Sequence, residues 1–194
     1  MSPDLPAVSR RGPRAWDERY ATRPWLADPS GTVVAACSDL RPGRAVDVAA
    51  GTGRHARWLA GLGWTVTAVD FSAVGIGQGR ELGSGLAVDW VVADALVWEP
   101  DGPVDLVLAA YVQLGVAGLR RAAGWLSPGG HLVVVGHALR NLTEGVHGPR
   151  HPALLHTAEQ LREAADNLRV LRLAEVLRPD DGGTGIDLVL VARR

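Results

Sequence analysis

The stretch VDVAAGTGRHARWLAGLGWTVTAVDFS, from Val46 to Ser72, decides the fold. It reads as a short buried strand, a glycine-containing loop, a helix and a second strand that ends in an acid. Gly51 and Gly53 follow the first strand directly and open the helix, so the backbone can pass close to a ligand there. Asp70, the acid, can accept hydrogen bonds from both hydroxyls of a ribose. The stretch therefore predicts a nucleotide-binding β-α-β unit.

The composition is that of an ordinary soluble globular protein. Of the 194 residues, 47% are apolar and 21% are charged, and the formal net charge is −1. The length predicts one domain with a substantial core, and the charge gives no pull toward nucleic acid or an anionic membrane. No apolar run reaches the roughly 20 residues that a membrane span needs. The N-terminal residues lack an apolar signal core and Cys37 is the single cysteine, so a cytoplasmic location is expected.

The sequence contains no lysine, and its basic side chains are all arginine. This absence excludes Schiff-base chemistry, pyridoxal-phosphate anchoring and a P-loop lysine. It also excludes the Tyr-x-x-x-Lys pair of short-chain reductases.

Apolar runs and helical periodicity alternate along the middle of the chain. Strands are expected at residues 45–49, 64–69, 87–92, 104–110 and 132–136, with helices at 54–62, 72–82 and 116–126. Strands that alternate with helices imply a parallel sheet covered on both faces. The helix at 72–82 is expected to be weak, because Gly75, Gly77 and Gly79 each cost helix stability relative to alanine.

The two ends depart from this alternation. Residues 1–14 are expected to form a flexible tail. Residues 15–43 are expected to form a helical cap, with one helix from Ala15 to Pro24 and another at 32–39. The single domain would then cover residues 15–194.

A different pattern closes the chain. A helix at 157–168 is followed by two strands, at 169–176 and 186–192, with turn-type residues between them. A parallel crossover needs a dozen or more residues and usually a helix. The last pair is therefore expected to be antiparallel, as an ending to an otherwise parallel α/β sheet.

The ligand of the glycine loop is the next question, because Gly51-x-Gly53-x-x-Ala56 also fits a dinucleotide fingerprint. Asp47 lies inside the first strand, where a buried acid is costly unless a cation meets it. A pyrophosphate would repel this acid, whereas the ammonium of an amino acid would be attracted to it. Asp94 follows the third strand and can accept from an adenine amino group. Three acids along one sheet edge favour an amino-acid nucleoside.

Motifs across residues 15–194 resemble class I S-adenosylmethionine-dependent methyltransferases. Within that superfamily the chain is similar to the small tellurite-resistance and thiopurine methyltransferase-like group. The matching pieces are WDERY at 16–20, DVAAGTGRHARWLA at 47–60, VTAVDFS at 66–72, VVADA at 91–95, AAYVQL at 109–114, LSPGGHLVVVGH at 126–137 and LRNLTEG at 139–145. The resemblance implies a Rossmann-like fold with seven strands, the last antiparallel, and S-adenosylmethionine as the cofactor.

The resemblance also implies which residues bind the cofactor. Asp47 and the glycine loop would hold its methionine end, and Asp70 its ribose, with Phe71 beside the adenine. The full expected set is Asp47, Ala49, Gly51, Thr52, Gly53, Arg54, Asp70, Phe71, Asp94, Ala95, Ala110 and Tyr111. The last two follow the fourth strand, where the reacting methyl group would lie.

The acceptor is expected to meet segments outside the sheet, the N-terminal cap and a substrate loop at 137–156. Aromatic faces suit a sulfonium cation, so Trp16, Tyr20 and Trp25 could wall its pocket; equally, they could fix the N-terminal helix to the domain. Arg140 and Asn141 are expected to hold an anionic acceptor.

The expected catalytic residues are His137, Tyr111 and Arg140, with His137 as a base at a strand end. No metal site is expected, because the histidines of the substrate loop match no helical pair.

These observations predict a methyltransferase that acts by in-line transfer on a small-molecule acceptor, with a sulfur, selenium or tellurium oxyanion, nitrogen or oxygen nucleophile. No nucleic-acid or membrane partner is expected. Two alternatives stay open: an NAD(P)-dependent oxidoreductase that uses the same loop, and a non-catalytic S-adenosylmethionine-binding domain.

Overall fold

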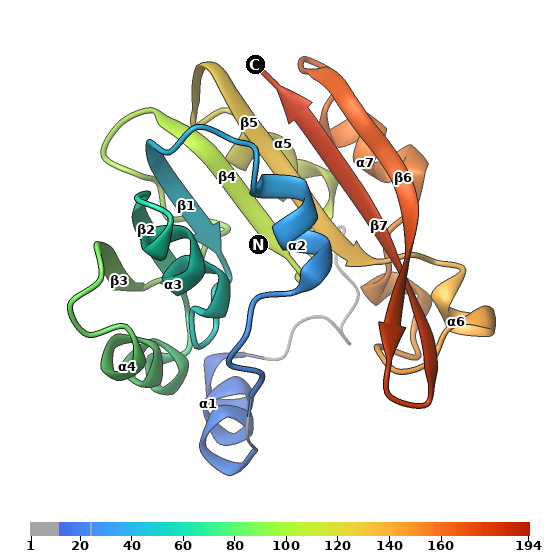
Figure 1. Ribbon diagram of the computed structural model, residues 1–194, viewed down its shortest axis with the longest axis horizontal. Coiled ribbons are helices and arrows are strands. Elements are labelled where there is room, and N and C mark those ends of the chain that lie inside the picture. The colour runs from blue at the N-terminus through green and yellow to red at the C-terminus, as the bar shows by residue number, and fades with distance from the viewer. Residues whose placement is uncertain (1–11, 24) are drawn as a thin grey trace.

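The computed structural model describes residues 12–23 and 25–194. Most of the expected tail at 1–14, and Pro24 as the expected end of the first helix, lie outside the described residues. Within the described ranges, one sheet has the strand order β3-β2-β1-β4-β5-β7-β6 (Figure 1). The strands are β1 Arg44–Val48, β2 Thr65–Asp70, β3 Val88–Val92, β4 Val104–Ala110, β5 Leu126–His137, β6 Arg169–Asp180 and β7 Gly183–Arg193.

The strand directions confirm the expected fold class. Parallel pairs join β3 to β2, β2 to β1, β1 to β4 and β4 to β5. The last strand, β7, is antiparallel both to β5 and to β6, with which it forms a hairpin. The chain therefore has the expected Rossmann-like sheet, mostly parallel with an antiparallel last strand.

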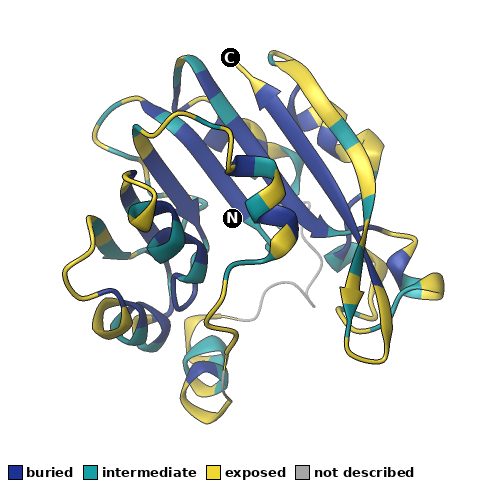
Figure 2. Ribbon diagram, viewed as in Figure 1, coloured by how far each residue is buried: buried dark blue, intermediate teal, exposed yellow. Residues whose placement is uncertain are grey.

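Helices pack on both faces of this sheet. They are α1 Pro13–Thr22, α2 Gly31–Cys37, α3 Arg54–Gly61, α4 Ala73–Leu82, α5 Gly115–Ala123, α6 Asn141–Glu144, the 3₁₀ helix η2 Pro152–Leu154, and α7 Ala158–Ala164. Apolar side chains of α2 and α3 form one core with the sheet, and those of α5 and α7 form the other. The central strands are buried, while the outer strand β6 is largely exposed (Figure 2). None of the described helices is long and apolar enough to cross a bilayer.

Several element boundaries differ from the expected ones. The first helix begins at Pro13, inside the expected tail, because proline suits the first turn of a helix. The fifth helix ends at Ala123, and β5 begins at Leu126, which pairs with Val104. The ladder between β4 and β5 is then irregular until His131, so the strand is longer than its apolar run. The expected loop at 137–156 contains α6 and η2.

Two glycines of α4, Gly75 and Gly79, are needed for packing against aromatic rings. The ring of Trp90 on β3 lies where a Cβ would stand at Gly79, and it also contacts the positions of Gly53 and Gly83. The ring of Tyr20 in α1 likewise lies 3.1 Å from the place where a Cβ would stand at Gly75. The glycines thus let two aromatic rings lie against the helix and the glycine loop.

Candidate functional site

Polar residues stand at one edge of the sheet, where the parallel strands end. In sheet order they are Asp94, Asp70, Asp47, Tyr111, His137 and Asp187. The order of connection reverses between β1 and β4, and ligands of open α/β sheets bind at such a reversal. We call the residues on β1 to β3 (Asp47, Asp70 and Asp94) the acidic half. We call those on β4, β5 and β7 (Tyr111, His137 and Asp187) the network half.

Asp47 is the most buried acid of the acidic half, with 1% of its surface exposed. Its Oδ2 accepts a 3.0 Å hydrogen bond from the amide of Ala56 in α3. Burial raises the pKa of Asp47 to about 7, while the Ala56 bond and the nearby Arg54 act to lower it. A carboxylate with so little solvation is stabilised by any cation that enters beside it.

Arg54 supplies a positive charge close to this acid. It is the first residue of α3, directly after Gly53, and its guanidinium lies 5.4 Å from the ring centroid of Tyr111. Burial lowers the pKa of Arg54, whereas Tyr111 and Asp47 act to raise it. Among the described residues, no acid forms an ion pair with Arg54. An acid and an uncommitted cation therefore lie together beside the glycine loop.

Asp70 ties the glycine loop to β2. Its Oδ2 accepts from the amide of Gly51 at 2.9 Å, and its Oδ1 accepts from the amide of Ser72 at 2.8 Å. Burial raises its pKa, and these two bonds act to lower it. Each oxygen keeps a further lone pair, so the carboxylate can still accept from a ligand. Phe71, the next residue, is half-buried beside it.

Asp94 and Ala95 lie at the same edge after β3. Asp94 is exposed, and its Oδ1 accepts from the amide of Leu96 at 2.9 Å, which closes a turn. The carbonyl of Ala95 accepts from Arg121. A turn therefore follows β3 at this edge, and Oδ2 of Asp94 can accept a hydrogen bond from a ligand.

The loop between β1 and α3 adopts left-handed backbone angles. The φ angles are 55° at Ala49, 59° at Gly51 and 68° at Gly53. A side chain at Gly51 would also overlap the hydroxyl of Tyr20, so glycine is required there on both counts. Thr52 is buried within the loop.

Helix α1 docks beside this loop. Asp17 accepts from the Ser72 hydroxyl at 2.5 Å and from the Val74 amide at 3.1 Å, both at the start of α4. The rings of Trp16 and Trp25 pack on Tyr20, with centroids 5.8 and 4.7 Å from it. Tyr20 alone of the three is buried, against the loop. The structure therefore brings Tyr20 to the site and uses the two tryptophans to pack around it.

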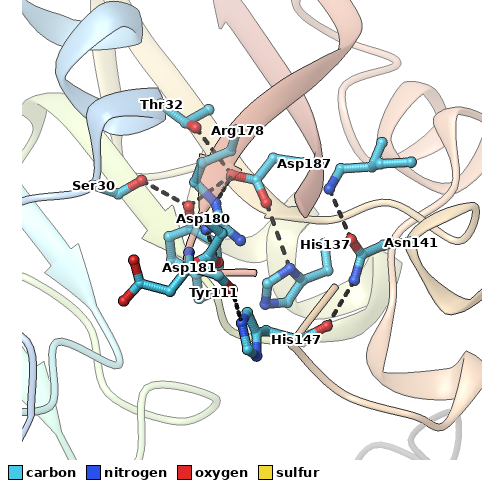
Figure 3. A network of polar contacts seen from close by, with 11 residues as sticks. Ser30, Thr32, Tyr111, His137, Asn141, His147, Arg178, Asp180, Asp181 and Asp187 are labelled. Atoms are coloured by element: carbon cyan, nitrogen blue, oxygen red, sulfur yellow. Dashed lines mark hydrogen bonds and ion pairs between the residues drawn. The ribbon is translucent and has the colours of Figure 1, made fainter. Parts of the chain in front are cut away.

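The network half centres on Asp187, whose side chain is fully buried (Figure 3). Its Oδ2 accepts from Tyr111 at 2.8 Å, from Thr32 at 2.9 Å and from Arg178 Nε at 3.1 Å. Burial acts to raise the pKa of Asp187, but contacts with His137, Tyr111 and Arg178 hold it below its usual value. Asp187 is therefore a carboxylate at neutral pH.

Tyr111 follows β4 directly, as Ala110 is the last residue of that strand. Its φ angle is 57°, an uncommon conformation that often marks functional sites. Its hydroxyl donates to Asp187 and lies 2.7 Å from the Ser30 hydroxyl. Burial and the charge of Asp187 raise its pKa to about 12, so Tyr111 keeps its proton.

His137 ends β5 and is the direct cross-strand partner of Asp187. Its Nδ1 lies 3.5 Å from Asp187 Oδ1, and its ring lies 5.3 Å from that of Tyr111. The structure thus brings together His137 and Tyr111, two of the three expected catalytic residues.

Arg140 and Asn141 take other positions. Arg140 is exposed, and its Nε lies 3.1 Å from Glu175 on the outer strand β6. Asn141 is fully buried: its Oδ1 accepts from the Ile186 amide at 2.7 Å, and its Nδ2 donates to the His147 carbonyl at 3.0 Å. The structure thus gives Arg140 an ion-pair partner and Asn141 backbone partners, and their contact with the acceptor stays a prediction.

Asp187 and Arg178 are absent from the expected site. Asp187 lies inside the apolar run of β7, as Asp47 lies inside that of β1. The same argument, that a buried acid must meet a donor or a cation, applies to it. Arg178 gives no comparable signal, since an arginine on an exposed strand is ordinary.

The central part of the chain is similar to a known protein family. Residues 45–130 match the family model described as a methyltransferase domain. No curated protein sequence matches the chain.

Solved structures match over nearly all of it. One, from work on the conversion of a disulfide bond into a thioacetal group during echinomycin biosynthesis, is 24% identical, covers 94% of this chain and 91% of its own, and has a TM-score of 0.75. An S-adenosylmethionine-dependent methyltransferase from Mesorhizobium loti is 20% identical, covers 87% and 100%, and scores 0.70. TehB from Haemophilus influenzae is 19% identical, covers 94% and 66%, and scores 0.69. Residues 45–130 are thus similar to a methyltransferase domain, and the chain shares the fold of these S-adenosylmethionine-dependent methyltransferases.

Proposed function

We propose that this protein transfers a methyl group from S-adenosylmethionine to a small-molecule acceptor. One observation carries the proposal: a left-handed glycine loop connects the strand of the buried acid Asp47 to Arg54, which begins α3 and forms no ion pair among the described residues. An α-amino acid carries an ammonium and a carboxylate on one carbon, so this pair complements its two charges. The methyltransferase domain match over the same residues supports the cofactor.

The rest of the acidic half fits the remainder of the cofactor. Asp70 would take the ribose hydroxyls with its free lone pairs. Phe71, Asp94 and Ala95 would meet the adenine. Tyr20, whose ring lies on Gly51, would cover the methionine end from the side of α1.

S-adenosylmethionine supplies a methyl carbon that is already activated: the acceptor lone pair forms the new bond to carbon, and the electron pair of the old carbon–sulfur bond stays on sulfur. The work left to this chain is to bind, to align the acceptor and to exclude water. The network half lies next to the acidic half across the β1–β4 reversal. We assign the acceptor to it, with His137 and Tyr111 as the groups that it meets.

The two alternatives are less well supported. A dinucleotide would bring its diphosphate to the loop beside the Asp47 carboxyl, where like charges repel. A domain that only binds the cofactor has no use for a half-buried tyrosine and histidine that meet a buried aspartate on the neighbouring strands.

Calorimetry with S-adenosylmethionine, S-adenosylhomocysteine and NADH tests the proposal. We expect binding of the first two and none of NADH; NADH binding without S-adenosylmethionine binding would overturn it. Arg54→Gln should weaken the binding of S-adenosylmethionine and S-adenosylhomocysteine by about tenfold, because it removes one charge-assisted hydrogen bond. Arg57→Gln is the matched control, because Arg57 lies on the same helix and donates to the Ala27 carbonyl.

A turnover screen then tests catalysis. Release of S-adenosylhomocysteine is followed with thiols, selenite, tellurite, amines and phenols. We expect turnover with at least one acceptor class. Tight cofactor binding without any turnover would favour the non-catalytic domain instead.

A further inference from the structure

Two buried polar atoms of the network half face each other without a hydrogen bond. They are Nδ1 of His137 and Oδ1 of Asp187, 3.5 Å apart. Both are inaccessible to solvent, and neither has another partner among the described residues. A buried donor and a buried acceptor left unpaired cost free energy. A small approach of Nδ1 and Oδ1 would form a hydrogen bond and remove this cost. Catalytic hydrogen bonds are often long without ligand and shorten when the site is filled.

The fold holds Asp187 in place for this contact. His137 and Asp187 are register partners on β5 and β7, so the backbone fixes their separation. The other oxygen of Asp187 already accepts from Tyr111, Thr32 and Arg178. These three bonds prevent the carboxylate from rotating, and they leave Oδ1 directed at the imidazole (Figure 3).

The opposite side of the imidazole faces a short loop. His147 and Gly148 both have left-handed backbone angles, with φ of 57° and 82°, and a Cβ at Gly148 would lie 3.0 Å from His137 Nε2. The loop is fixed by Asn141 and by a contact of the His147 ring with the Asp181 carbonyl. Among the described residues, Nε2 of His137 has no hydrogen-bond partner.

The other titratable groups around His137 keep their protons or are engaged with other partners. Tyr111 keeps its proton, because burial and Asp187 raise its pKa to about 12. Burial lowers the pKa of His156 to about 4, and its Nε2 is engaged with the Val112 carbonyl. Arg178 is paired with Asp180 and Asp187. Arg54 lies over the Tyr111 ring, and the His147 ring contacts the Asp181 carbonyl.

We propose that Asp187 is a positioning residue that holds His137 as a general base, and that the methyl acceptor is therefore a protic nucleophile. The inference rests on the proposed methyl transfer and names the acceptor class. His137 donates its Nδ1–H to Asp187 and keeps that proton, so the lone pair of the neutral imidazole lies on Nε2. As the acceptor atom bonds to the methyl carbon, its O–H, N–H or S–H proton moves to Nε2 and then to water. An acceptor that arrives as an oxyanion, such as selenite, would not need this device.

The imidazole itself can be observed in the free protein. With ¹⁵N-labelled histidine, NMR reports which ring nitrogen carries the proton, and His137→Gln identifies the signal by its loss. We expect His137 to be protonated at Nδ1 in the wild type and to become a mixture of tautomers in Asp187→Asn. Thr32→Val is the matched control, because it removes a bond to the other carboxylate oxygen; the tautomer should stay unchanged. A wild-type His137 protonated at Nε2, or one indifferent to Asp187→Asn, would overturn the positioning role.

Turnover tests the acceptor class separately. The probes are 4-methylphenol, thiophenol and benzylamine as protic acceptors and selenite as the oxyanion. A positioned base contributes roughly 100-fold or more, so His137→Gln should lose about that factor in kcat with the protic acceptors. Asp187→Asn should lose about tenfold. Turnover of selenite alone, or equal losses with all probes, would overturn the protic class. No turnover with any probe would count against the proposed function, and the NMR result would still decide the role of Asp187.

Discussion

The two halves of the site edge are built in opposite ways. In the acidic half, Asp47 and Asp70 bind backbone amides that lie nine and 19 residues away in sequence. In the network half, Asp187 binds side chains that lie 76 residues away, at Tyr111, and 155 residues away, at Thr32. The hydrogen bonds of the acidic half therefore form within one β-α-β unit, whereas those of the network half join segments that are distant in sequence.

Under the proposed function, this difference separates the residues for cofactor binding from those for methyl transfer. Backbone amides hold the acids of the first half in fixed places, which suits a cofactor whose shape does not change between acceptors. Side-chain bonds hold the second half, so its residues can be exchanged without disturbing the glycine loop. Substitutions in the acidic half should change cofactor affinity, and substitutions in the network half should change turnover.

Asp47→Asn should have the largest effect on binding. Removing the charge opposite an ammonium costs about 1.5–3 kcal/mol, so S-adenosylmethionine should bind roughly 10- to 100-fold more weakly. Isothermal calorimetry at pH 7.5 measures this. An affinity within twofold of the wild type would show that Asp47 does not face the methionine end.

Gly79→Ala should cost about 1–3 kcal/mol of unfolding free energy, because the new methyl group meets the ring of Trp90. Gly77→Ala in the same helix has open space around it and should gain about 0.5–1 kcal/mol. Urea unfolding followed by tryptophan fluorescence compares the two. If both alanines stabilise the protein, Trp90 does not rest on α4.

Folding stability and cofactor affinity should depend on pH with opposite signs. Burial raises the pKa of Asp47 to about 7, above the roughly 4 of an unfolded carboxyl. Between pH 4 and 7 the folded state holds the extra proton, so stability falls as pH rises, by up to about 1.4 kcal/mol per unit. Asp70, with a raised pKa, adds to this slope.

The same carboxyl must ionise to meet an ammonium. Cofactor affinity should therefore rise up to about tenfold per pH unit toward pH 7 and then level off. Calorimetry at several pH values measures it, with Asp47→Asn as the flat reference. If the affinity of the wild type for S-adenosylmethionine does not change with pH, Asp47 does not contact the cofactor.

Tyr111→Phe should have the smallest effect. It removes the hydroxyl that donates to Asp187 but keeps the ring under Arg54. Stability should fall by about 1 kcal/mol, while cofactor affinity should change less than twofold. Thermal unfolding and calorimetry on one sample test both. A loss of affinity as large as that of Asp47→Asn would mean that the halves do not act separately.

The sequence predicts the acidic half well because its signals are local. Strand, glycine loop, helix and terminal acid all fall within the 27 residues from Val46 to Ser72. The antiparallel ending is also local, since the short segment between the last two strands excludes a crossover.

The network half is predicted only in part, for physical reasons. Tyr111 and His137 follow strands, so their place at the edge can be inferred. Asp187 meets them because β7 inserts between β5 and β6, and a pairing of this kind is not encoded near Asp187. Asn141 looks like a ligand for the acceptor in LRNLTEG, but a buried amide can satisfy backbone just as well.

The insertion of β7 also sets an order for assembly. Residues 45–95 contain the strands and acids of the cofactor side, and they emerge from the ribosome long before Asp187. Strand pairs that are distant in sequence form slowly, because the chain loses loop-closure entropy before the stabilising contacts are made. The residues of the acidic half are thus all synthesised before Tyr111 and His137 can meet Asp187, so under the proposed function the cofactor site would be completed before the acceptor site.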